Sequence, residues 1–555
     1  MKLSFKSLNQ SMWKSHKQTK DLVTMAELRS HSNSSSGAAA VELPRGKSTA
    51  AYGNEDTKNN NSYSTSQIVG LILGPLLFLL MLYVLPLPGL SFEGRAVLAT
   101  TAWMAVWWVT EAIPLGITSL MPLILLPLMG AVDGNTAASS YGASLIFLFI
   151  GGFALALALE RWNLHERIAI TIISAVGAST SGLVLGFMLA TGFLSMWVSN
   201  MATVMLMIPI GLAIIAKVVT LMKEDDVYTK EEETKFTKSI IFAIGFGGTI
   251  GGSATLIGTP TNLLLAGLAG ELLGIDISFG HFFIFAFPLI VVLMLFAIFY
   301  ITKIAYPVNV KKITNGKQFV VDRKKQLGKM SYEEKIVLAI FSITAFMWVT
   351  RTFIWSDIIP GLSDTMIAMV AAVLLHAIPS KGKPGERILT ADSLKHMPWG
   401  VLLLVGGGLA LASGFNGTDL ASWIGNQLLL LEGTSYILVL VVTVLLGIAM
   451  TQVTSNTATV TILIPITAAL AMAINVHPLP LMTAVAMGAG FAFILPIGTP
   501  SNAIIFATGK ITMMDMLRKG AWLTVLAFAL IVVFVYFILP VVFGINQFEY
   551  PEALK

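Results

Sequence analysis

The sequence predicts an all-α membrane protein that crosses the bilayer many times, and three observations support this fold class. The chain of 555 residues is 55% hydrophobic and only 12% charged, with a mean hydropathy of +0.79. Soluble domains carry about 25% charged residues, so the composition excludes a soluble class. Apolar runs at 68–84 and 282–301 approach the roughly 20 residues that span a bilayer core as a helix. Similar motifs also recur in the two halves of the chain, which indicates internal repeats.

Charge and residue usage exclude other classes. The net charge of +5 comes without a basic patch interleaved with aromatic residues, so we expect no nucleic-acid partner. The chain has no cysteine, which excludes disulfides, thiolate catalysis and cysteine-ligated metals. The histidines show no metal-binding spacing, and no nucleophile stands with a base at membrane depth. We therefore expect neither an enzyme nor a bound cofactor.

The hydrophobic pattern divides the chain into two similar halves preceded by one span. The N-terminal residues are polar and rich in Ser, Lys and Asn, so they bury too little apolar surface to fold. We expect a disordered tail there, with an organellar transit peptide as the alternative. The predicted boundaries are a polar tail at 1–65, a first transmembrane helix at 66–94, a first repeat at 95–310, a cytoplasmic linker at 311–332, a second repeat at 333–545 and a C-terminal tail at 546–555.

Apolar runs of helical length define the elements in order, and charged or proline-containing stretches separate them. The first span is 67–86. The first repeat is expected to contain spans at 95–109, 113–130 (bent by its prolines) and 144–162, an amphipathic helix at 164–177, apolar limbs at 181–198 and 202–218, a broken helix at 238–272 and a span at 280–303. The second repeat is expected to contain spans at 333–352, 362–378 and 398–416, a short helix at 419–430, limbs at 434–454 and 458–475, a broken helix at 480–509 and a span at 520–543. About eleven transmembrane helices and two re-entrant hairpins result.

Two polar strings interrupt apolar runs at corresponding places. SNMATVMLMIPI begins at Ser199 and SNTATVTILIPI begins at Ser455, and eight of their twelve positions are identical. Polar groups are costly in lipid because no water supplies their partners. The offset 455 − 199 = 256 is shared by the strings GGFALA and GGLALA that begin at 151 and 407, and a Gly-Thr-Pro-x-Asn motif recurs at an offset of 498 − 258 = 240. Three matches in the same order indicate a duplicated chain, in which each polar string is the tip of a hairpin made by two limbs.

The distribution of Lys and Arg predicts the orientation. Loop 303–335 carries nine basic residues against three acidic ones, loop 381–395 carries four against two, and Arg518-Lys519 lies between the last two spans. All three sites are inside if the N-terminus is cytoplasmic and the limb pairs are re-entrant, which satisfies the positive-inside rule and places the C-terminus outside. The odd number of five spans per repeat then makes the repeats inverted. The charge count is the same if the limbs span, so it does not separate these arrangements.

The Gly-Thr-Pro-x-Asn motifs at 258–262 and 498–502 predict breaks in two spanning helices. Proline removes a helical hydrogen bond, and glycine permits dihedrals that other residues resist. A break exposes carbonyls that suit an alkali cation at one half-helix end and amides that attract an anion at the other. Broken helices in corresponding positions of two halves predict a transport site near the middle of the membrane. The structural alternative is that these Ser, Thr and Asn side chains only bond one helix to another.

No Lys, Arg, Asp or Glu lies within the four motifs. A bound anion would therefore depend on amides, hydroxyls and co-bound cations, which favours sodium coupling over a proton relay. A neutral substrate would also fit. Arg351 and Asp364, which flank a short connection elsewhere, are expected at the surface.

The four motifs, together with Thr110-Glu111-Ala112-Ile113-Pro114, resemble the divalent anion/sodium symporter family over about 67–545. This family comprises sodium-coupled carriers of dicarboxylates, citrate and sulfate, within the ion transporter superfamily. The resemblance implies a homodimer that works by an elevator motion of a transport domain against a scaffold domain. The sodium ligands it implies are Ser195, Ser199, Asn200 and Gly258 at one site and Thr451, Thr454, Asn456 and Gly498 at the other, and the substrate contacts are Asn200, Asn456, Thr457, Thr259, Thr499 and Pro500.

Residues and resemblance together predict a symporter that carries succinate, malate, fumarate or citrate with sodium across the plasma membrane or an organellar membrane. A sodium-independent dicarboxylate exchanger, a sulfate carrier and a channel are the alternatives. Met201 is a departure, because it stands where the family pattern has threonine. A thioether donates no hydrogen bond, so we expect this residue to affect the substrate more than sodium binding.

Overall fold

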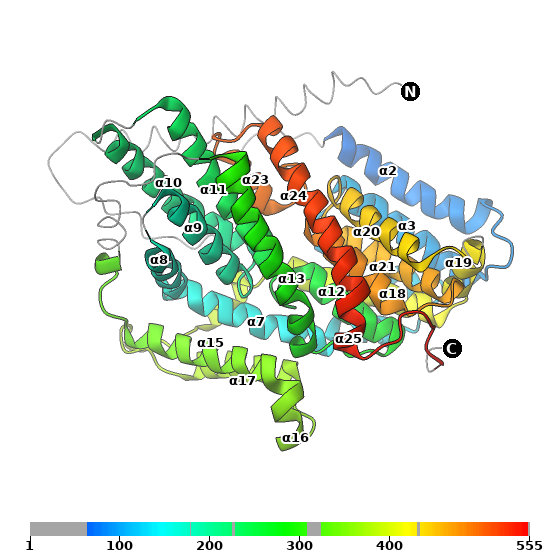
Figure 1. Ribbon diagram of the computed structural model, residues 1–555. Coiled ribbons are helices and arrows are strands. Elements are labelled where there is room, and N and C mark those ends of the chain that lie inside the picture. The colour runs from blue at the N-terminus through cyan, green and yellow to red at the C-terminus, as the bar shows by residue number, and fades with distance from the viewer. Residues whose placement is uncertain (1–63, 178, 225–227, 308–323, 430–432, 553–555) are drawn as a thin grey trace.

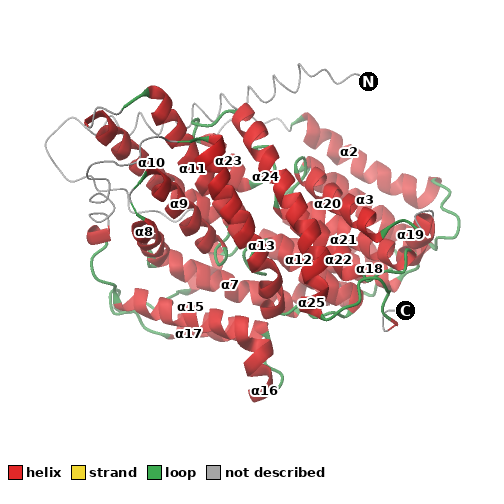
Figure 2. Cartoon of the chain, in the orientation of Figure 1, coloured by secondary structure: helices red, strands yellow, loops and turns green. Residues whose placement is uncertain are grey.

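The computed structural model describes residues 64–177, 179–224, 228–307, 324–429 and 433–552. In these ranges every regular element is a helix, apart from an isolated bridge between Pro379 and Arg387. Figure 2 shows this all-helical chain, which confirms the helical class. The predicted disordered tail lies outside the described residues except for its last two positions, and so does the first part of the predicted linker.

The helices follow the predicted order. In the first half they are α2 (Thr65–Leu79) with its extension η1 (Leu80–Val84), α3 (Phe92–Thr110), α4 (Leu115–Thr118), α5 (Pro122–Leu128), α6 (Gly134–Ser139), η2 (Ser140–Gly142), α7 (Ser144–Arg161), α8 (Leu164–Val176), α9 (Thr180–Ser195), α10 (Asn200–Glu224), α11 (Lys230–Gly252), α12 (Pro260–Leu273), α13 (Phe279–Phe299) and η3 (Tyr300–Ala305). In the second half they are α15 (Tyr332–Thr350), η4 (Arg351–Trp355), α16 (Ser356–Ile358), α17 (Asp364–Ala377), η5 (Ala391–His396), α18 (Trp399–Gly417), α19 (Leu420–Leu428), α20 (Tyr436–Thr451), α21 (Asn456–Ala473), α22 (Pro478–Gly490), α23 (Pro500–Ala507), α24 (Met513–Val533), η7 (Phe534–Ile538) and α25 (Leu539–Phe543).

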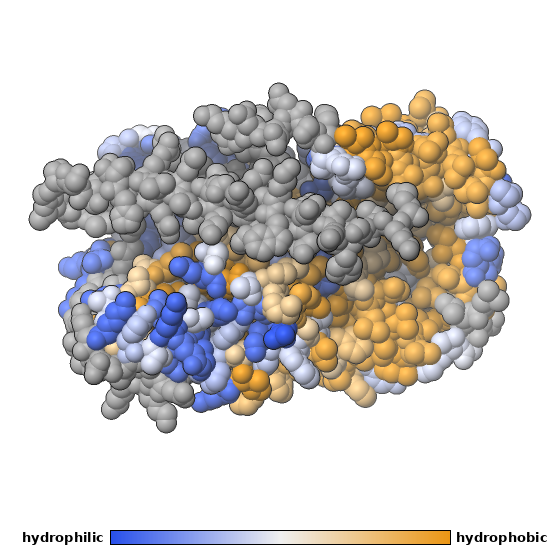
Figure 3. Space-filling view, turned by 90° about the horizontal axis from the view of Figure 1, so that it is seen from above, coloured by the Kyte–Doolittle hydropathy of each residue, from blue (hydrophilic) through white to orange (hydrophobic). Residues whose placement is uncertain are grey.

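Eight of the described helical segments are long and apolar enough to cross a membrane, and five shorter apolar helices accompany them. The second limbs of the predicted hairpins, α10 and α21, are among the eight, whereas the first limbs, α9 and α20, are among the shorter helices. Helix α2 exposes apolar side chains such as Ile72 and Leu76. Figure 3 shows a broad hydrophobic surface on the side of the molecule where Figure 1 places α2, as expected of a surface that faces lipid.

Local sequence explains where helices begin and end. Ser331 and Glu334 form a capping box at the start of α15, in which each side chain accepts a bond from the backbone of the other residue. The predicted bent span 113–130 corresponds to the apolar segment Leu115–Leu128, which is interrupted between α4 and α5. Pro122 explains this interruption, because it has no amide proton to continue a helix and is favoured at a helix start.

Each half of the chain packs against the other at the two broken helices, which are labelled in Figure 2. After the first break, α12 packs against α21 and α22 of the second half. After the second break, α23 packs against α10 and α11 of the first half. Within each half the first limb packs against the helix that precedes the break, α9 on α11 and α20 on α22. Each broken helix is therefore held partly by its own half and partly by the other.

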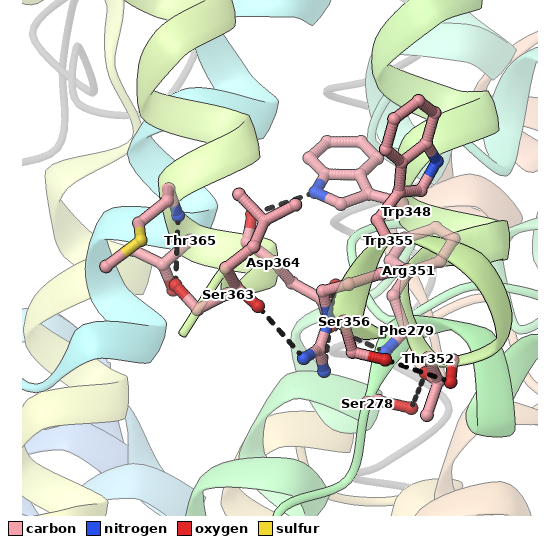
Figure 4. Close-up of polar contacts among 12 residues, drawn as sticks. Ser278, Phe279, Trp348, Arg351, Thr352, Trp355, Ser356, Ser363, Asp364 and Thr365 are labelled. Carbon is pink, nitrogen blue, oxygen red and sulfur yellow. Dashed lines mark hydrogen bonds and ion pairs between the residues drawn. The ribbon is translucent and has the colours of Figure 1, made fainter. Parts of the chain in front are cut away.

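The polar contacts in Figure 4 correct one expectation, since Asp364 is buried and Arg351 is only partly exposed, and the two form an ion pair. Arg351 Nε lies 2.5 Å from Asp364 Oδ1, and the two side chains are 13% and 9% exposed. Asp364 Oδ2 also accepts a hydrogen bond from the backbone N–H of Phe279 at 2.8 Å. The carboxylate thus joins the starts of α13 and α17 to the end of α15, a contact that the linear pattern of charges does not reveal.

Replacing Arg351 with methionine is expected to leave the Asp364 carboxylate buried without its partner. Such a loss costs about 3–5 kcal/mol, so the Arg351→Met variant should unfold at a clearly lower temperature in detergent. Lys395→Met is the control, because Lys395 pairs with Asp392 at the surface, where the side chains are 79% and 59% exposed. Equal unfolding temperatures for the two variants would contradict this role of the buried pair.

Candidate functional site

The first polar string forms the turn between α9 and α10. Helix α9 ends at Ser195, and α10 begins at Asn200. Ser199 Oγ accepts a hydrogen bond from the backbone N–H of Ala202 at 3.3 Å. This is the bond by which a serine caps the N-terminus of a helix. Ser199 therefore stabilises the start of α10.

The second polar string has the same geometry. Helix α20 ends at Thr451, and α21 begins at Asn456. Ser455 Oγ accepts from the backbone N–H of Ala458 at 3.2 Å. The two strings are therefore similar both in sequence and in this capping hydrogen bond.

Three oxygens meet at the end of α9. Ser195 Oγ lies 2.6 Å from Asn200 Oδ1 and 2.7 Å from the carbonyl oxygen of Gly248 in α11. A serine hydroxyl has a single proton, so it satisfies only one of these two acceptors at a time. Ser195 is also fully buried. The three oxygens therefore offer several lone pairs but share only the one hydroxyl proton.

The end of α20 repeats this group with threonine in place of serine. Thr451 Oγ1 lies 2.7 Å from Asn456 Oδ1 and 2.8 Å from the carbonyl oxygen of Ala489 in α22. We call these two groups the first and the second oxygen cluster. Hard cations bind oxygen ligands, so the composition of both clusters fits a small alkali cation.

Two glycines allow the first break to approach the first cluster. An ideal Cβ on Gly252 would lie 1.9 Å from Asn200 Oδ1, and one on Gly258 would lie 2.2 Å from the carbonyl oxygen of Gly252. Neither distance is tolerable, so only glycine permits these contacts. Ser195, Asn200 and Gly258 are thus brought together through Gly252, while the Ser199 hydroxyl caps α10.

Each break includes the Gly-Thr that opens its motif, as predicted, but it begins upstream of the motif, and the proline belongs to the helix that follows. Helix α11 ends at Gly252, and Pro260 is already the first residue of α12. Asn262 Nδ2 donates to the carbonyl oxygens of Ser253 and Thr255 at 3.2 and 2.8 Å. The asparagine of the motif therefore reaches back and satisfies two carbonyls that the break has released from the helix.

The unwound segment of the second break is stabilised by the same kind of hydrogen bond. Helix α22 ends at Gly490, and α23 begins at Pro500. Asn502 Nδ2 donates to the carbonyl oxygens of Ala492 and Leu495 at 2.7 and 3.0 Å. Both asparagines belong to the predicted motifs, but their hydrogen bonds to the unwound backbone were not predicted. Their recurrence two residues after a proline was the one indication in the sequence.

The breaks also contact the tips and each other. Thr255 Oγ1 donates to the carbonyl oxygen of Met196 in the first tip at 2.5 Å. An ideal Cβ on Gly490, at the second break, would lie 3.1 Å from Ser253 Oγ of the first break. The end of α22, where the second break begins, is therefore a neighbour of the unwound segment of the first break.

The remaining predicted site residues lie on the tips and breaks. Thr457 Oγ1 lies 3.4 Å from Ser455 Oγ, and Thr259 Oγ1 lies 2.7 Å from Thr261 Oγ1. Thr499 Oγ1 accepts from the backbone N–H of Asn502 at 3.2 Å. Gly498 and Thr499 are buried, whereas Pro500 is exposed.

The two tips differ in several hydrogen bonds, one of which joins two threonines of the second tip. Thr454 Oγ1 lies 2.6 Å from Thr459 Oγ1 in the second tip. The corresponding residues of the first tip are Val198 and Thr203, since 454 − 198 and 459 − 203 both equal 256. Valine offers no hydroxyl, and Thr203 Oγ1 is buried without a hydrogen-bond partner in the part of the chain that the structure describes. The second tip therefore has a threonine pair where the first tip has a valine and an unpaired threonine hydroxyl, among the described residues.

Most of the chain resembles a known family of membrane carriers. Residues 66–544 match the family model described as the sodium:sulfate symporter transmembrane region. The sodium-dependent dicarboxylate transporter SdcS of Staphylococcus saprophyticus is 48% identical over 503 residues, which are 90% of this chain and 96% of that protein. The SdcS protein of Staphylococcus aureus strain MRSA252 is 46% identical with the same coverage.

Two solved structures align with the chain at low identity. The YdaH transporter of Alcanivorax borkumensis has a TM-score of 0.50 at 11% identity, over 80% of this chain and 98% of that structure. MtrF of Neisseria gonorrhoeae has a TM-score of 0.49 at 15% identity, over 86% and 96%. The likeness to YdaH concerns the fold alone.

Replacing Asn262 with alanine is expected to destabilise the unwound segment of the first break, because its hydrogen bonds to that segment are lost. The carbonyls of Ser253 and Thr255 would be buried without a partner, which costs about 1–3 kcal/mol and lowers the unfolding temperature in detergent. Asn416→Ala is the control, because Asn416 is exposed and its Nδ2 makes a single bond, to the carbonyl oxygen of Glu271 at 2.6 Å. An Asn262→Ala variant no less stable than the control would refute this stabilising role.

Proposed function

Because this chain belongs to the sodium:sulfate symporter family, we propose that it is a sodium-coupled symporter of dicarboxylates or tricarboxylates. Succinate, malate, fumarate and citrate are the expected substrates. The relatives named sodium-dependent dicarboxylate transporters, at 48% and 46% identity, support this choice. As a carrier, the protein binds its substrate and releases it unchanged.

The two oxygen clusters are the observation on which the coupling proposal rests. In each of them a hydroxyl and two further oxygens share one proton, so that a sodium ion would find lone pairs already facing it. The unwound chain beside each cluster would add carbonyl oxygens. The proposed sodium ligands, through side-chain or backbone oxygens, are Ser195, Ser199, Asn200 and Gly258 at the first site and Thr451, Thr454, Asn456 and Gly498 at the second.

The absence of charged residues from the four motifs explains why the substrate would need sodium. A carboxylate in such a site meets only dipoles from side-chain amides, hydroxyls and helix starts, so bound sodium supplies the compensating charge. A net positive charge carried with the substrate would gain about 2.3 kcal/mol per charge per 100 mV of membrane potential. The proposed substrate contacts are Asn200, Asn456, Thr457, Thr259, Thr499 and Pro500.

We also propose the finer architecture that the family resemblance implies. Each limb pair, α9 with α10 and α20 with α21, would be a re-entrant hairpin in a chain of about eleven transmembrane helices. The equivalent packing of α9 on α11 and of α20 on α22 supports two structural repeats, and these would be inverted. An elevator motion, a homodimer, and a plasma-membrane orientation with the N-terminus inside and the C-terminus outside complete this proposal.

Two alternatives remain for the transport mode. The family description names sulfate, which would also fit a site made of amides and hydroxyls. Exchange of dicarboxylates without sodium would use the same tips, but it would leave the oxygen clusters without a role. Sodium dependence therefore separates exchange from symport, and a substrate panel separates sulfate from carboxylates.

Uptake into cells that express the full chain tests the proposed function. Uptake of labelled succinate should fall by at least about tenfold when choline replaces sodium, because the coupling ions are then missing. Labelled citrate and sulfate are measured in parallel, with cells lacking the chain as the background. Succinate uptake that is indifferent to sodium would overturn the symport proposal.

Met201 tests which part of the first tip meets the substrate. Met201→Thr restores a hydroxyl at the position matched by Thr457, so the ratio of citrate to succinate uptake should change by about two- to tenfold, as one hydrogen bond of about 0.5–1.5 kcal/mol allows. The sodium concentration for half-maximal uptake should stay the same. Met205→Thr is the control, since Met205 lies one turn further along α10 and is exposed. A shift in sodium dependence with an unchanged substrate ratio would contradict this assignment.

A further inference from the structure

Gln452, which follows the last residue of α20, has a buried side-chain amide of which only the nitrogen is hydrogen-bonded among the described residues. The residue is 8% exposed, and its side-chain Nε2 donates to the carbonyl oxygen of Ile448 at 3.3 Å. Its Oε1 is buried and has no hydrogen-bond partner among the described residues. A buried polar oxygen without a partner is costly, so this atom is expected to have a role outside the hydrogen bonds of the protein itself.

The unpaired oxygen lies beside the second break. An ideal Cβ on Gly498 would be 3.5 Å from Gln452 Oε1, which places the amide oxygen against the residue that opens the second Gly-Thr-Pro motif. The residue before it is Thr451, whose hydroxyl belongs to the second oxygen cluster. Gln452 therefore stands in the tip between the second cluster and the second break.

The first half has no counterpart to this oxygen. The matched position is Met196, since 452 − 256 = 196. A thioether is a weak acceptor and a poor ligand for a hard cation, whereas an amide oxygen is a good one. The two clusters are alike, and this amide oxygen is one of the differences between their surroundings.

We propose that Gln452 Oε1 is an additional sodium ligand of the second site, and that it makes this site bind sodium more tightly than the first. The inference rests on the proposed sodium coupling and adds a residue and an order of affinity to it. An arriving sodium ion would accept the lone pair that the protein leaves free. The Nε2 bond to Ile448 holds the amide so that its oxygen, and not its nitrogen, faces Gly498.

The test measures sodium binding through stability, independently of transport. The purified full chain is unfolded by heat in detergent while sodium replaces choline at constant ionic strength, and the sodium concentration for half-maximal stabilisation is determined. Gln452→Met, which installs the residue of the first half, should raise this concentration by about tenfold. In choline alone the variant should unfold at the wild-type temperature or above it, because a costly unpaired oxygen has been removed.

A purely structural role for Gln452 predicts a different pattern. The loss of the Nε2 bond to Ile448 would then lower the unfolding temperature equally in choline and in sodium, with an unchanged sodium midpoint. That result would overturn the proposal. Met196→Leu is the matched control, and its sodium midpoint is expected to equal that of the wild type.

Two further outcomes are decisive. If Gln452→Met does not fold, Gln452→Glu is measured instead, because it keeps an oxygen at this place. Its sodium midpoint should be equal to or lower than that of the wild type. A higher sodium midpoint overturns the proposal. A wild-type chain that sodium stabilises, with an unaltered Gln452→Met midpoint, refutes only the role of Gln452. A wild-type chain that sodium neither stabilises nor drives in uptake refutes the proposed function as well.

Discussion

Each half of the molecule depends on one buried hydroxyl that has two acceptors and a single proton. Ser195 and Thr451 stand at the end of the first limb, where each meets an asparagine oxygen of the tip and a carbonyl of the helix before the break. The limb, the tip and the broken helix are therefore joined at one point. Such an arrangement leaves one lone pair unsatisfied, and a sodium ion would satisfy it without any charged side chain. Structural cohesion and ion binding would thus use the same atoms.

The interlocked packing extends this local arrangement to the whole transport site. Each half-helix after a break contacts a limb of the opposite half, so the two halves share packed helices beside the tips. The asparagines of the two Gly-Thr-Pro-x-Asn motifs keep the unwound segments in one conformation, since they satisfy carbonyls that would otherwise be unpaired. Two symmetric halves with unequal tips, one of them with an extra threonine pair, would allow two sodium ions to bind in a fixed order.

The sequence was sufficient to predict the helical class, the order of elements and the pairing of the motifs, because a duplicated chain repeats both residue types and spacing. It located both breaks at the motifs but not their upstream starts, and the proline is the first residue of the next helix, as Pro260 and Pro500 are. The ion pair of Arg351 with Asp364 and the orientation of Gln452 could not be predicted. Both depend on segments that meet only in the folded chain, and no local pattern records them.

Cryo-electron microscopy of the full chain in lipid nanodiscs tests the central claim most directly. Maps would be compared in sodium with succinate and in choline with succinate. The account predicts density in both oxygen clusters in sodium, beside Ser195 and Asn200 and beside Thr451 and Asn456, and its loss in choline. Clusters that are empty in sodium, or that hold the same density in both salts, would contradict it.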